Sequence, residues 1–311
     1  MKALRKTAQG AGHVAVDNVP DPLPGKNQVR IRLACAGICG TDLHFFHGDF
    51  AKVRPPVTLG HEVAGTVDAV GEGVTAWQPG DRVTVESEAH TCGKCHACRN
   101  GRSNLCAERL ALGYGVDGGF AEALVVRQSA LHRLPDRVSF QEGALSEPLT
   151  VAVHAVSERS SLKSGEWALI TGPGPIGLLV LQVVRAAGGY AIVTGTARDA
   201  ERLRLAYELG AEATVQVDEE DLASRIEQIT EGQGVASAFE CSGVGAAIGD
   251  CLACVQSGGE IIQIGLYGQS ISLDMDQVAM REIVLKGAFV HTSETWKKAI
   301  ALMDTKAVNL K

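Results

Sequence analysis

The sequence lacks a long apolar run, an apolar leader and an excess of positive charge. None of its 311 residues form a stretch long and apolar enough for a membrane-spanning helix. The first ten residues, MKALRKTAQG, have no apolar core of the kind a signal peptide needs. The net charge of −7 gives no general attraction to nucleic acid. We therefore expect a cytoplasmic protein that binds neither membranes nor nucleic acid.

The length and the residue pattern predict two domains with different folds. A chain of 311 residues exceeds what one hydrophobic core usually organises. Residues 1–150 contain short runs of β-branched residues separated by glycine and proline turns, which indicates a small barrel or sandwich. Residues 151–290 alternate strand-like and helix-like segments, which is typical of a parallel doubly wound sheet. The predicted fold class is therefore α/β with a separate β-rich domain.

Four cysteines lie close together within residues 90–108. They are spaced C-x2-C-x2-C-x7-C, at Cys92, Cys95, Cys98 and Cys106. Four thiolates can close a tetrahedral coordination sphere around Zn²⁺ with no position left for substrate, so we predict a structural zinc site. Disulfides or free thiols are the alternatives, and disulfides require an oxidising compartment. Apart from Cys39, we expect the remaining cysteines to be buried core thiols: Cys35, Cys241, Cys251 and Cys254.

A glycine-rich segment predicts a dinucleotide-binding loop. The sequence Gly172-Pro173-Gly174-Pro175-Ile176-Gly177 fits G-x-G-x-x-G and lies between a predicted strand and a predicted helix. Gly172 would permit the tight turn, Gly174 the approach of a pyrophosphate, and Gly177 the packing of helix on strand. A ligand-free glycine turn in a strand–helix unit is the alternative.

The end of the next strand predicts which nicotinamide dinucleotide binds. NAD sites usually place an acid there to bind the ribose 2′-OH, but this strand ends with Gly195 and Thr196, followed by Arg198. An arginine can pair with a 2′-phosphate, so we favour NADP over NAD. Two alternatives stay open: Arg198 is a solvated charge at a helix start, or Asp199 substitutes weakly for the acid.

A second group of residues has the chemistry of a catalytic metal site. Cys39 lies in GICGTDLH, and His61 and Glu62 follow in a G-H-E triplet. One thiolate, one imidazole and one carboxylate form a mixed ligand set suited to catalytic Zn²⁺ with an open position.

Taken together, these motifs resemble the zinc-dependent medium-chain alcohol dehydrogenase superfamily. GICGTDLH, GHE, the four-cysteine segment, DGGFAE, EPL and GPGPIG occur in the family's order along nearly the whole chain. The resemblance is strongest to the branch of sorbitol (L-iditol) and L-threonine dehydrogenases. It implies a GroES-like β-barrel domain, a Rossmann domain, and two zinc ions per chain, one catalytic and one structural.

The resemblance also implies roles for individual residues. Glu147, before a proline, is expected at the catalytic zinc together with Cys39, His61 and Glu62, directly or through water. Thr41 and His44 are expected to relay a proton while zinc acts as a Lewis acid on the substrate oxygen. A surface histidine is the alternative for His44. Phe45, the next residue, occupies a position that often lines the substrate cleft. The resemblance implies that Pro175, Ile176, Gly195 and Thr196 contact the cofactor with the three loop glycines and Arg198.

The family's length implies that the C-terminal end is truncated here. Family members continue for roughly thirty to forty residues that rejoin the first domain. Residues 291–311 would then be only the start of this returning segment, and we expect reduced stability from exposed edges.

The resulting functional hypothesis is hydride transfer between NAD(P) and a secondary alcohol or ketone. The substrate is expected to be a polyol, a sugar alcohol or a 3-hydroxy amino acid, and the protein a homo-oligomer, either dimer or tetramer. Two alternatives are a catalytically inactive, truncated cofactor-binding homologue and a zinc-lobe nucleic-acid binder, and the acidic net charge disfavours the second.

Overall fold

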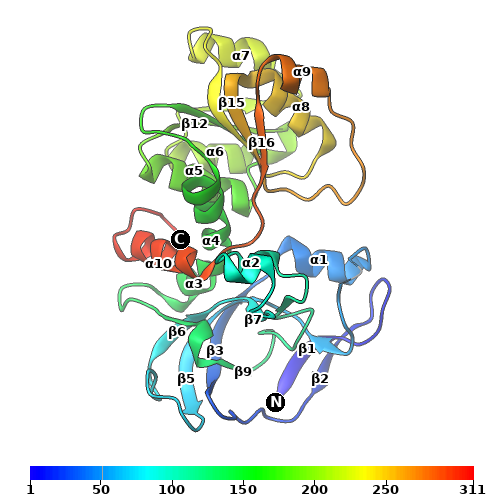
Figure 1. The fold of residues 1–311 in the computed structure, drawn as a ribbon, viewed down its shortest axis with the longest axis vertical. Helices are drawn as coiled ribbons and strands as arrows, with labels where there is room; N and C mark the ends of the chain where they lie inside the picture. The colour runs from blue at the N-terminus through cyan, green and yellow to red at the C-terminus, as the bar shows by residue number, and fades with distance from the viewer. Residues whose placement is uncertain (51) are drawn as a thin grey trace. The chain divides into compact units, whose positions relative to one another are not determined.

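The computed structural model describes residues 1–50 and 52–311, which divide into two units (Figure 1). The first unit contains Met1–Glu147, Thr292–Asp304 and Leu310–Lys311. The second contains Pro148–His291 and Thr305–Asn309. No described helix is both long enough and apolar enough to cross a lipid bilayer.

The first unit is built from antiparallel strands. A five-stranded sheet has the order β10-β6-β5-β3-β9, a three-stranded sheet the order β2-β1-β4, and β7 pairs with β8. The strands are β1 Lys2–Lys6, β2 Val14–Asn18, β3 Gln28–Gly37, β4 Val57–Thr58, β5 Glu62–Val70, β6 Arg82–Val85, β7 Glu88–His90, β8 Leu110–Ala111, β9 Ala123–Arg127 and β10 Leu131–Arg133. In β3, Val29 and Ile31 are fully buried and alternate with arginines, so the period of two directs one face into the core.

Short helices connect these strands, and a C-terminal helix packs on the same unit. The helices are α1 Gly40–His47, α2 His96–Arg99, α3 Phe140–Ala144 and α10 Ser293–Asp304, with 3-10 turns at Ser103–Leu105 and Gln128–Ala130. On α10, Trp296 is fully buried, and its ring stacks on His132 with centroids 4.9 Å apart. Ser146 also donates a hydrogen bond to the sulfur of Met303. These contacts attach α10 to the first unit.

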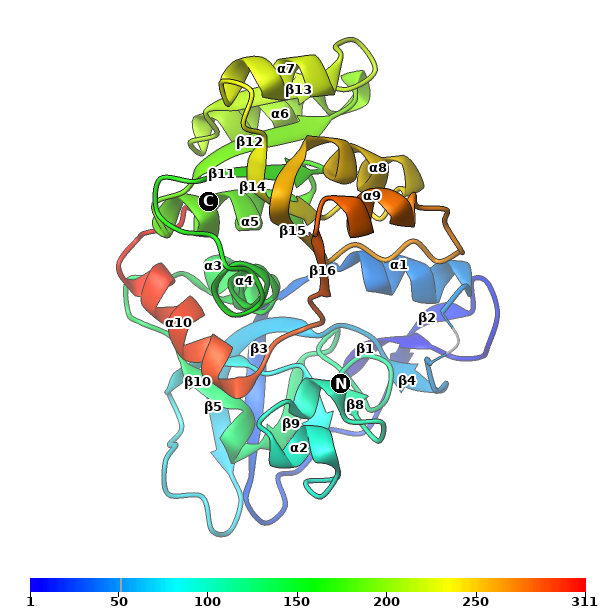
Figure 2. The same ribbon diagram turned by 45° about the horizontal axis from the view of Figure 1, so that its top comes forward.

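The second unit contains a parallel six-stranded sheet of order β13-β12-β11-β14-β15-β16 (Figure 2). Its strands are β11 Trp167–Thr171, β12 Tyr190–Gly195, β13 Ala213–Gln216, β14 Val235–Glu240, β15 Val255–Gln263 and β16 Val284–Gly287. Its helices are α5 Pro175–Ala186, α6 Ala200–Glu208, α7 Leu222–Ile229, α8 Gly245–Cys254 and α9 Met275–Met280, with a 3-10 turn at Ala197–Asp199. Helix α4, Ser146–Val153, and a π-helical turn, His154–Arg159, lead into this unit. The predicted doubly wound parallel sheet is confirmed.

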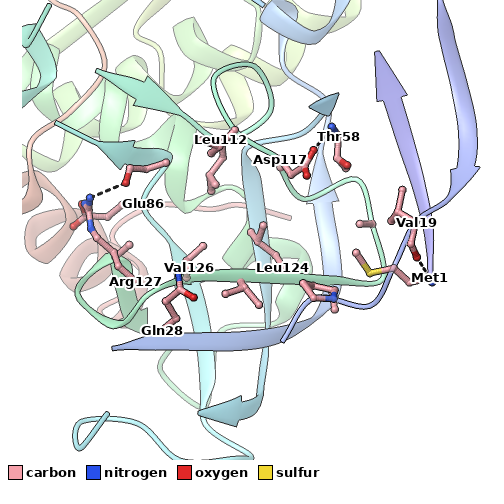
Figure 3. Close-up of a pocket in the computed structure, with 18 of the residues that line it drawn as sticks. Met1, Val19, Gln28, Thr58, Glu86, Leu112, Asp117, Leu124, Val126 and Arg127 are labelled. Atoms are coloured by element: carbon pink, nitrogen blue, oxygen red, sulfur yellow. Dashed lines mark hydrogen bonds and ion pairs between the residues drawn. The ribbon is translucent and has the colours of Figure 1, made fainter. Parts of the chain in front are cut away.

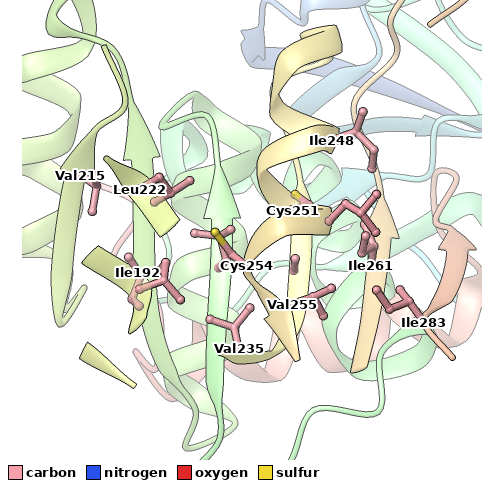
Figure 4. Packing of buried hydrophobic residues seen from close by; sticks show 14 residues of the cluster. Ile192, Val215, Leu222, Val235, Ile248, Cys251, Cys254, Val255, Ile261 and Ile283 are labelled. Atoms are coloured by element: carbon pink, nitrogen blue, oxygen red, sulfur yellow. The ribbon is translucent and has the colours of Figure 1, made fainter. Parts of the chain in front are cut away.

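The core of the second unit is formed by strands and by helices α7 and α8 (Figure 4). Ile192, Val215 and Ile261 come from three strands and are fully buried. Cys251 and Cys254 on α8 are buried among them, as predicted. The prediction of a buried thiol is wrong for Cys35, which is only partly buried, whereas burial raises the pKa of the Cys241 thiol well above its ordinary value. Cys35 lies in the second half of β3, where exposed and partly buried residues alternate, and Cys241 lies just beyond the end of β14.

Candidate active site

Three of the predicted metal ligands converge in the first unit. Cys39 is the N-cap residue of α1, His61 directly precedes β5, and Glu62 begins β5. One ligand atom from each lies within 4.8 Å of the others. His61 and Glu62 are 7% and 6% exposed, so the carboxylate and the imidazole are removed from solvent. Cys39 thus meets two residues that lie 22 and 23 positions further along the chain.

Gly37 provides the space that Glu62 occupies. The two residues are paired across β3 and β5. A Cβ added to Gly37 would lie 2.1 Å from Oε2 of Glu62, so any side chain there would displace the carboxylate. The sequence interpretation missed this role, although the first glycine of GICG marked a constrained position.

The cluster concentrates negative charge in a buried site. Burial, followed by the charge of Glu147, raises the pKa of Glu62 to about 7. Burial alone would lower the pKa of His61, but a hydrogen bond with Cys39 and the charges of Glu147, Cys39 and Asp42 raise it to about 10. Burial also raises the pKa of Asp42. The raised pKa values of the two carboxyl groups reflect burial and neighbouring negative charge, whereas the raised pKa of His61 reflects its negatively charged neighbours.

The atoms of this cluster fit a zinc ion. Nδ1 of His61 and Oδ1 of Asp42 are 3.9 Å apart, and among the described residues neither buried atom has a hydrogen-bond partner. The two atoms face each other at ion-pair distance, so Asp42 can orient the His61 ring from the Nδ1 side. A thiolate, an imidazole and a carboxylate supply sulfur, nitrogen and oxygen donors of the kind that bind zinc.

Glu147 lies near this cluster without belonging to the three-residue ligand set. Its carboxylate is 6% exposed and accepts a hydrogen bond from Oγ of Ser87 at 2.9 Å. Its charge acts on the pKa of both His61 and Glu62. The structure therefore brings Glu147 into electrostatic range of the predicted zinc ligands.

The four-cysteine segment forms a separate cluster. Sγ atoms of the four cysteines all lie within 4.8 Å of one another, and those of Cys92 and Cys98 are 4.0 Å apart. The backbone N–H of Cys95 donates to Sγ of Cys92 at 3.3 Å. Hydrogen bonds from the backbone of Lys94 and Cys95 lower the pKa of Cys92 to about 7, which favours the thiolate. Four thiols in this arrangement fit a closed tetrahedral zinc site.

Helix α1 places the two predicted relay residues on one face. Thr41 and His44 are three positions apart, so their side chains lie one helical turn apart on the same side. Nδ1 of His44 is 3.0 Å from Oδ1 of Asp49. This contact occupies one ring nitrogen and leaves Nε2 as the nitrogen that can accept a proton.

The prediction for Phe45 is wrong. Its side chain is fully buried and packs on Phe50 and Tyr114, with ring centroids 5.3 and 5.5 Å away. Phe45 is adjacent to His44 in sequence, but successive helical residues point about 100° apart, so it faces the core while His44 faces solvent. Phe46, in contrast, is 49% exposed.

The three glycines of the dinucleotide loop lie in different structural surroundings. Gly172 has φ of +85°, and a Cβ on Gly177 would lie 2.0 Å from the carbonyl oxygen of Gly172. The protein itself requires glycine at these two positions. A Cβ on Gly174, however, would meet no atom within 4 Å. The open space beside Gly174, at the N-cap of the twelve-residue helix α5, fits the approach of a pyrophosphate.

A fully buried carboxylate accepts hydrogen bonds from the segments next to this loop. Glu240, at the end of β14, accepts hydrogen bonds from Thr171, Ser242, Gly243 and Gln263. These donors belong to the ends of β11 and β15 and to the turn after β14. A Cβ on Gly172 would lie 2.8 Å from Cβ of Ser242, so this turn and the loop are in close contact.

The segment after β12 carries the residues predicted to discriminate NADP from NAD. Gly195 is buried, and a Cβ there would lie 3.0 Å from Pro173 of the loop. The N–H and Oγ1 of Thr196 both donate to Oδ2 of Asp199, at 3.1 and 3.0 Å. Asp199 is therefore engaged in capping the turn, and the side chain of Arg198 is exposed.

A cavity of about 540 Å³ in the first unit does not coincide with any of these clusters (Figure 3). Leu112, Leu124 and Val126 line it together with Glu86 and Arg127. The two charged side chains form an ion pair of 3.5 Å. Cys39, His61 and Glu62 are not among its lining residues, so its size does not make it the candidate catalytic site.

Comparison with known proteins decides the family. The model for the alcohol dehydrogenase GroES-like domain matches residues 25–136, and the model for zinc-binding dehydrogenase matches residues 175–305. Sorbitol dehydrogenase of Halalkalibacterium halodurans is 40% identical over 312 residues, covering 100% of this chain and 90% of that protein. The chain belongs to the zinc-dependent medium-chain alcohol dehydrogenases.

Other members of the family are similar over the same extent. D-arabitol-phosphate dehydrogenase of Enterococcus avium is 37% identical over 311 residues, covering 100% of this chain and 88% of the relative. A protein of Sinorhizobium meliloti 1021, described as a zinc-binding dehydrogenase and solved bound to NADP, superposes with a TM-score of 0.91 at 34% identity. That match covers 99% of this chain and 89% of the other.

These similarities confirm the predicted family, its fold and its class of reaction. The β-rich first unit is a GroES-like domain and the second a Rossmann domain. The protein is an oxidoreductase of the alcohol and polyol dehydrogenase type, with zinc and a nicotinamide dinucleotide as its cofactors.

Proposed function

We propose that this dehydrogenase oxidises a polyol, a sugar alcohol or a 3-hydroxy amino acid, or reduces the corresponding ketone, with a preference for NADP. The observation that carries the catalytic part is the convergence of one sulfur, one nitrogen and one oxygen donor from Cys39, His61 and Glu62. The names of the relatives in Halalkalibacterium halodurans and Enterococcus avium support a polyol or its phosphate as the substrate class.

We propose two zinc ions per chain with different purposes. Cys39, His61 and Glu62 would hold the catalytic ion, with Glu147 close to it. When bound there, zinc supplies a Lewis acid for the substrate oxygen. The cysteines of the four-cysteine segment would hold the structural ion, since their four thiolates leave no open position.

The chain's own residues would move the alcohol proton. The hydroxyl of Thr41 can accept and donate a proton, and His44 lies one helical turn further on an exposed part of α1. The contact between Nδ1 of His44 and Asp49 leaves Nε2 to exchange the proton with water. This sequence of groups supports Thr41 and His44 as the relay.

The nicotinamide dinucleotide would bind to the second domain through two groups of residues. Residues 1–150 would form the catalytic domain and residues 151–290 the cofactor domain, with residues 291–311 returning to the first. Gly172, Gly174, Pro175, Ile176 and Gly177 would contact the pyrophosphate, since Gly174 borders open space at the N-terminus of α5. Gly195, Thr196 and Arg198 would contact the adenosine ribose, and the exposed arginine supports a 2′-phosphate.

Two further expectations stay proposals. We propose a homo-oligomer, which would cover the edge strand β16, where Val284 and Leu285 are 45% and 44% exposed. We also propose a cytoplasmic location, because the described cysteines are all unbridged thiols, which a reducing compartment maintains.

A cofactor and substrate screen tests the proposed function. Polyols, their phosphates, L-threonine, diols and simple ketones would each be assayed with NAD(H) and NADP(H). We expect turnover with at least one polyol-like substrate and a higher kcat/KM with NADP than with NAD. Turnover of simple ketones alone would contradict the substrate class, and a strong NAD preference would contradict the assignment of Gly195 and Arg198.

A further inference from the structure

A carboxylate from the neighbouring strand lies beside the segment predicted to bind the adenosine ribose. Strands β12 and β13 run parallel, with Gly195 opposite Gln216. The backbone N–H of Val217 continues the pairing by donating to the carbonyl of Gly195 at 2.9 Å. The next residue, Asp218, therefore emerges at the same edge of the sheet as Thr196.

Asp218 makes a specific contact with the turn after β12. Its Oδ1 and Oδ2 accept the backbone N–H of Ala197 at 2.9 and 3.1 Å. Ala197 follows directly after Thr196 and begins the 3-10 turn beyond the end of β12. Backbone N–H groups in such turns are natural partners for an anion, and here an internal carboxylate already takes that role.

The other charged side chains around this turn do not neutralise the carboxylate of Asp218. Arg202 lies 3.5 Å from Asp199, so these two side chains already balance each other. Arg198 forms no ion pair with any residue that the structure describes, and it remains an exposed cation. The turn thus lies beside one unpaired positive charge, that of Arg198, and one negative charge, that of the Asp218 carboxylate bound to the N–H of Ala197.

We propose that Asp218 is a specificity-determining residue that opposes the 2′-phosphate of NADP. Its negative charge repels a phosphate bound beside Thr196, whereas a ribose 2′-OH can donate a hydrogen bond to the same carboxylate. The acid missing from the end of β12 is in this way supplied by the end of β13. Arg198 and Asp218 act in opposite directions, and their balance sets the ratio of NADP to NAD affinity. The inference rests on the proposed adenosine site at Gly195–Arg198.

The test compares two adenosine ligands that differ only in the 2′-phosphate. Calorimetry would give the Kd of adenosine 2′,5′-bisphosphate and of adenosine 5′-monophosphate for the whole protein and for Asp218→Asn. Asparagine keeps an oxygen for the N–H of Ala197 and removes the charge. We expect the bisphosphate to bind about fivefold tighter to Asp218→Asn, with the monophosphate within about twofold of its original Kd, as for one exposed charge.

Two controls make the result specific. Glu219→Gln removes the same charge one residue further along an exposed segment, and should change neither Kd. Arg198→Gln should weaken the bisphosphate selectively. Equal effects of Asp218→Asn and Glu219→Gln, or equal tightening of both ligands, would overturn the proposal. If the whole protein favours NAD but Asp218→Asn still tightens the bisphosphate alone, the proposed NADP preference fails and the role of Asp218 stands.

Discussion

Two glycines in the same loop should differ in how much stability the protein loses when each is replaced by alanine. A methyl at position 174 meets no protein atom within 4 Å, and the residue has φ of −73°, which alanine adopts without strain. Loss of glycine at an N-cap costs about 0.5–1 kcal/mol. Alanine also restricts the unfolded chain more than glycine does, which stabilises the folded protein by about 0.4–1 kcal/mol. The stability of Gly174→Ala should therefore stay close to that of the original protein.

Gly177→Ala should behave differently because the protein itself occupies the space. The added Cβ would lie 2.0 Å from the carbonyl oxygen of Gly172, and a backbone atom cannot rotate away. Overpacking costs about 1–3 kcal/mol. A helical alanine recovers about 0.5–1 kcal/mol of this. The net loss of roughly 1–2 kcal/mol corresponds to a fall in Tm of about 4 °C for a domain of this size.

Thermal unfolding and NADPH binding, measured on both variants, separate the two effects. Gly174→Ala should keep its Tm and weaken NADPH by about tenfold or more, since the methyl stands where the pyrophosphate approaches. Gly177→Ala should lose stability and affinity together. The reasoning is refuted if Gly174→Ala binds NADPH with unchanged Kd, or if its Tm falls as far as that of Gly177→Ala.

Three other changes have distinct expected outcomes. Cys98→Ser should release one zinc and lower Tm while the kcat of the folded protein changes little, as metal analysis with kinetics would show; an unchanged Tm would speak against a structural site. Glu240→Gln should cost about 2 kcal/mol in urea unfolding, because its amide would face the donors of Ser242 and Gly243; a loss within error of zero would disprove the role of this carboxylate. Trp296→Ala should cost about 3–5 kcal/mol, because the buried ring packs against His132, whereas a small loss would show that α10 contributes little to the first unit.

Local sequence patterns predicted much of the fold. The short β-branched runs of the first domain include residues 62–70, which form strand β5, and glycines at 71 and 73 mark the turn that ends it. The helix after the glycine loop is equally clear, because proline lies at its start and its apolar residues follow a helical period. Cysteine spacing was also sufficient to anticipate the four-thiol cluster, because short loops constrain the positions of the sulfur atoms.

The features that sequence could not predict depend on register and on neighbouring strands. Gly37 faces Glu62 only after two irregularities in the pairing of β3 and β5, and alternation alone does not reveal such shifts. Asp218 reaches Ala197 because β13 lies beside β12, which is a property of the sheet order. The error at Phe45 has a similar origin, since tertiary packing decides which face of α1 is buried.

Zinc analysis of the original protein and of Cys39→Ser tests the central claim most directly. The account predicts two zinc ions per chain and alcohol-dependent reduction of NADP in the original protein. For Cys39→Ser it predicts an intact fold and no turnover. One zinc ion per chain should remain, held by the four-cysteine segment. Circular dichroism on the same samples would establish the fold. A variant that keeps both zinc ions, or one that loses a zinc and still turns over substrate, would contradict the assignment of the catalytic metal site.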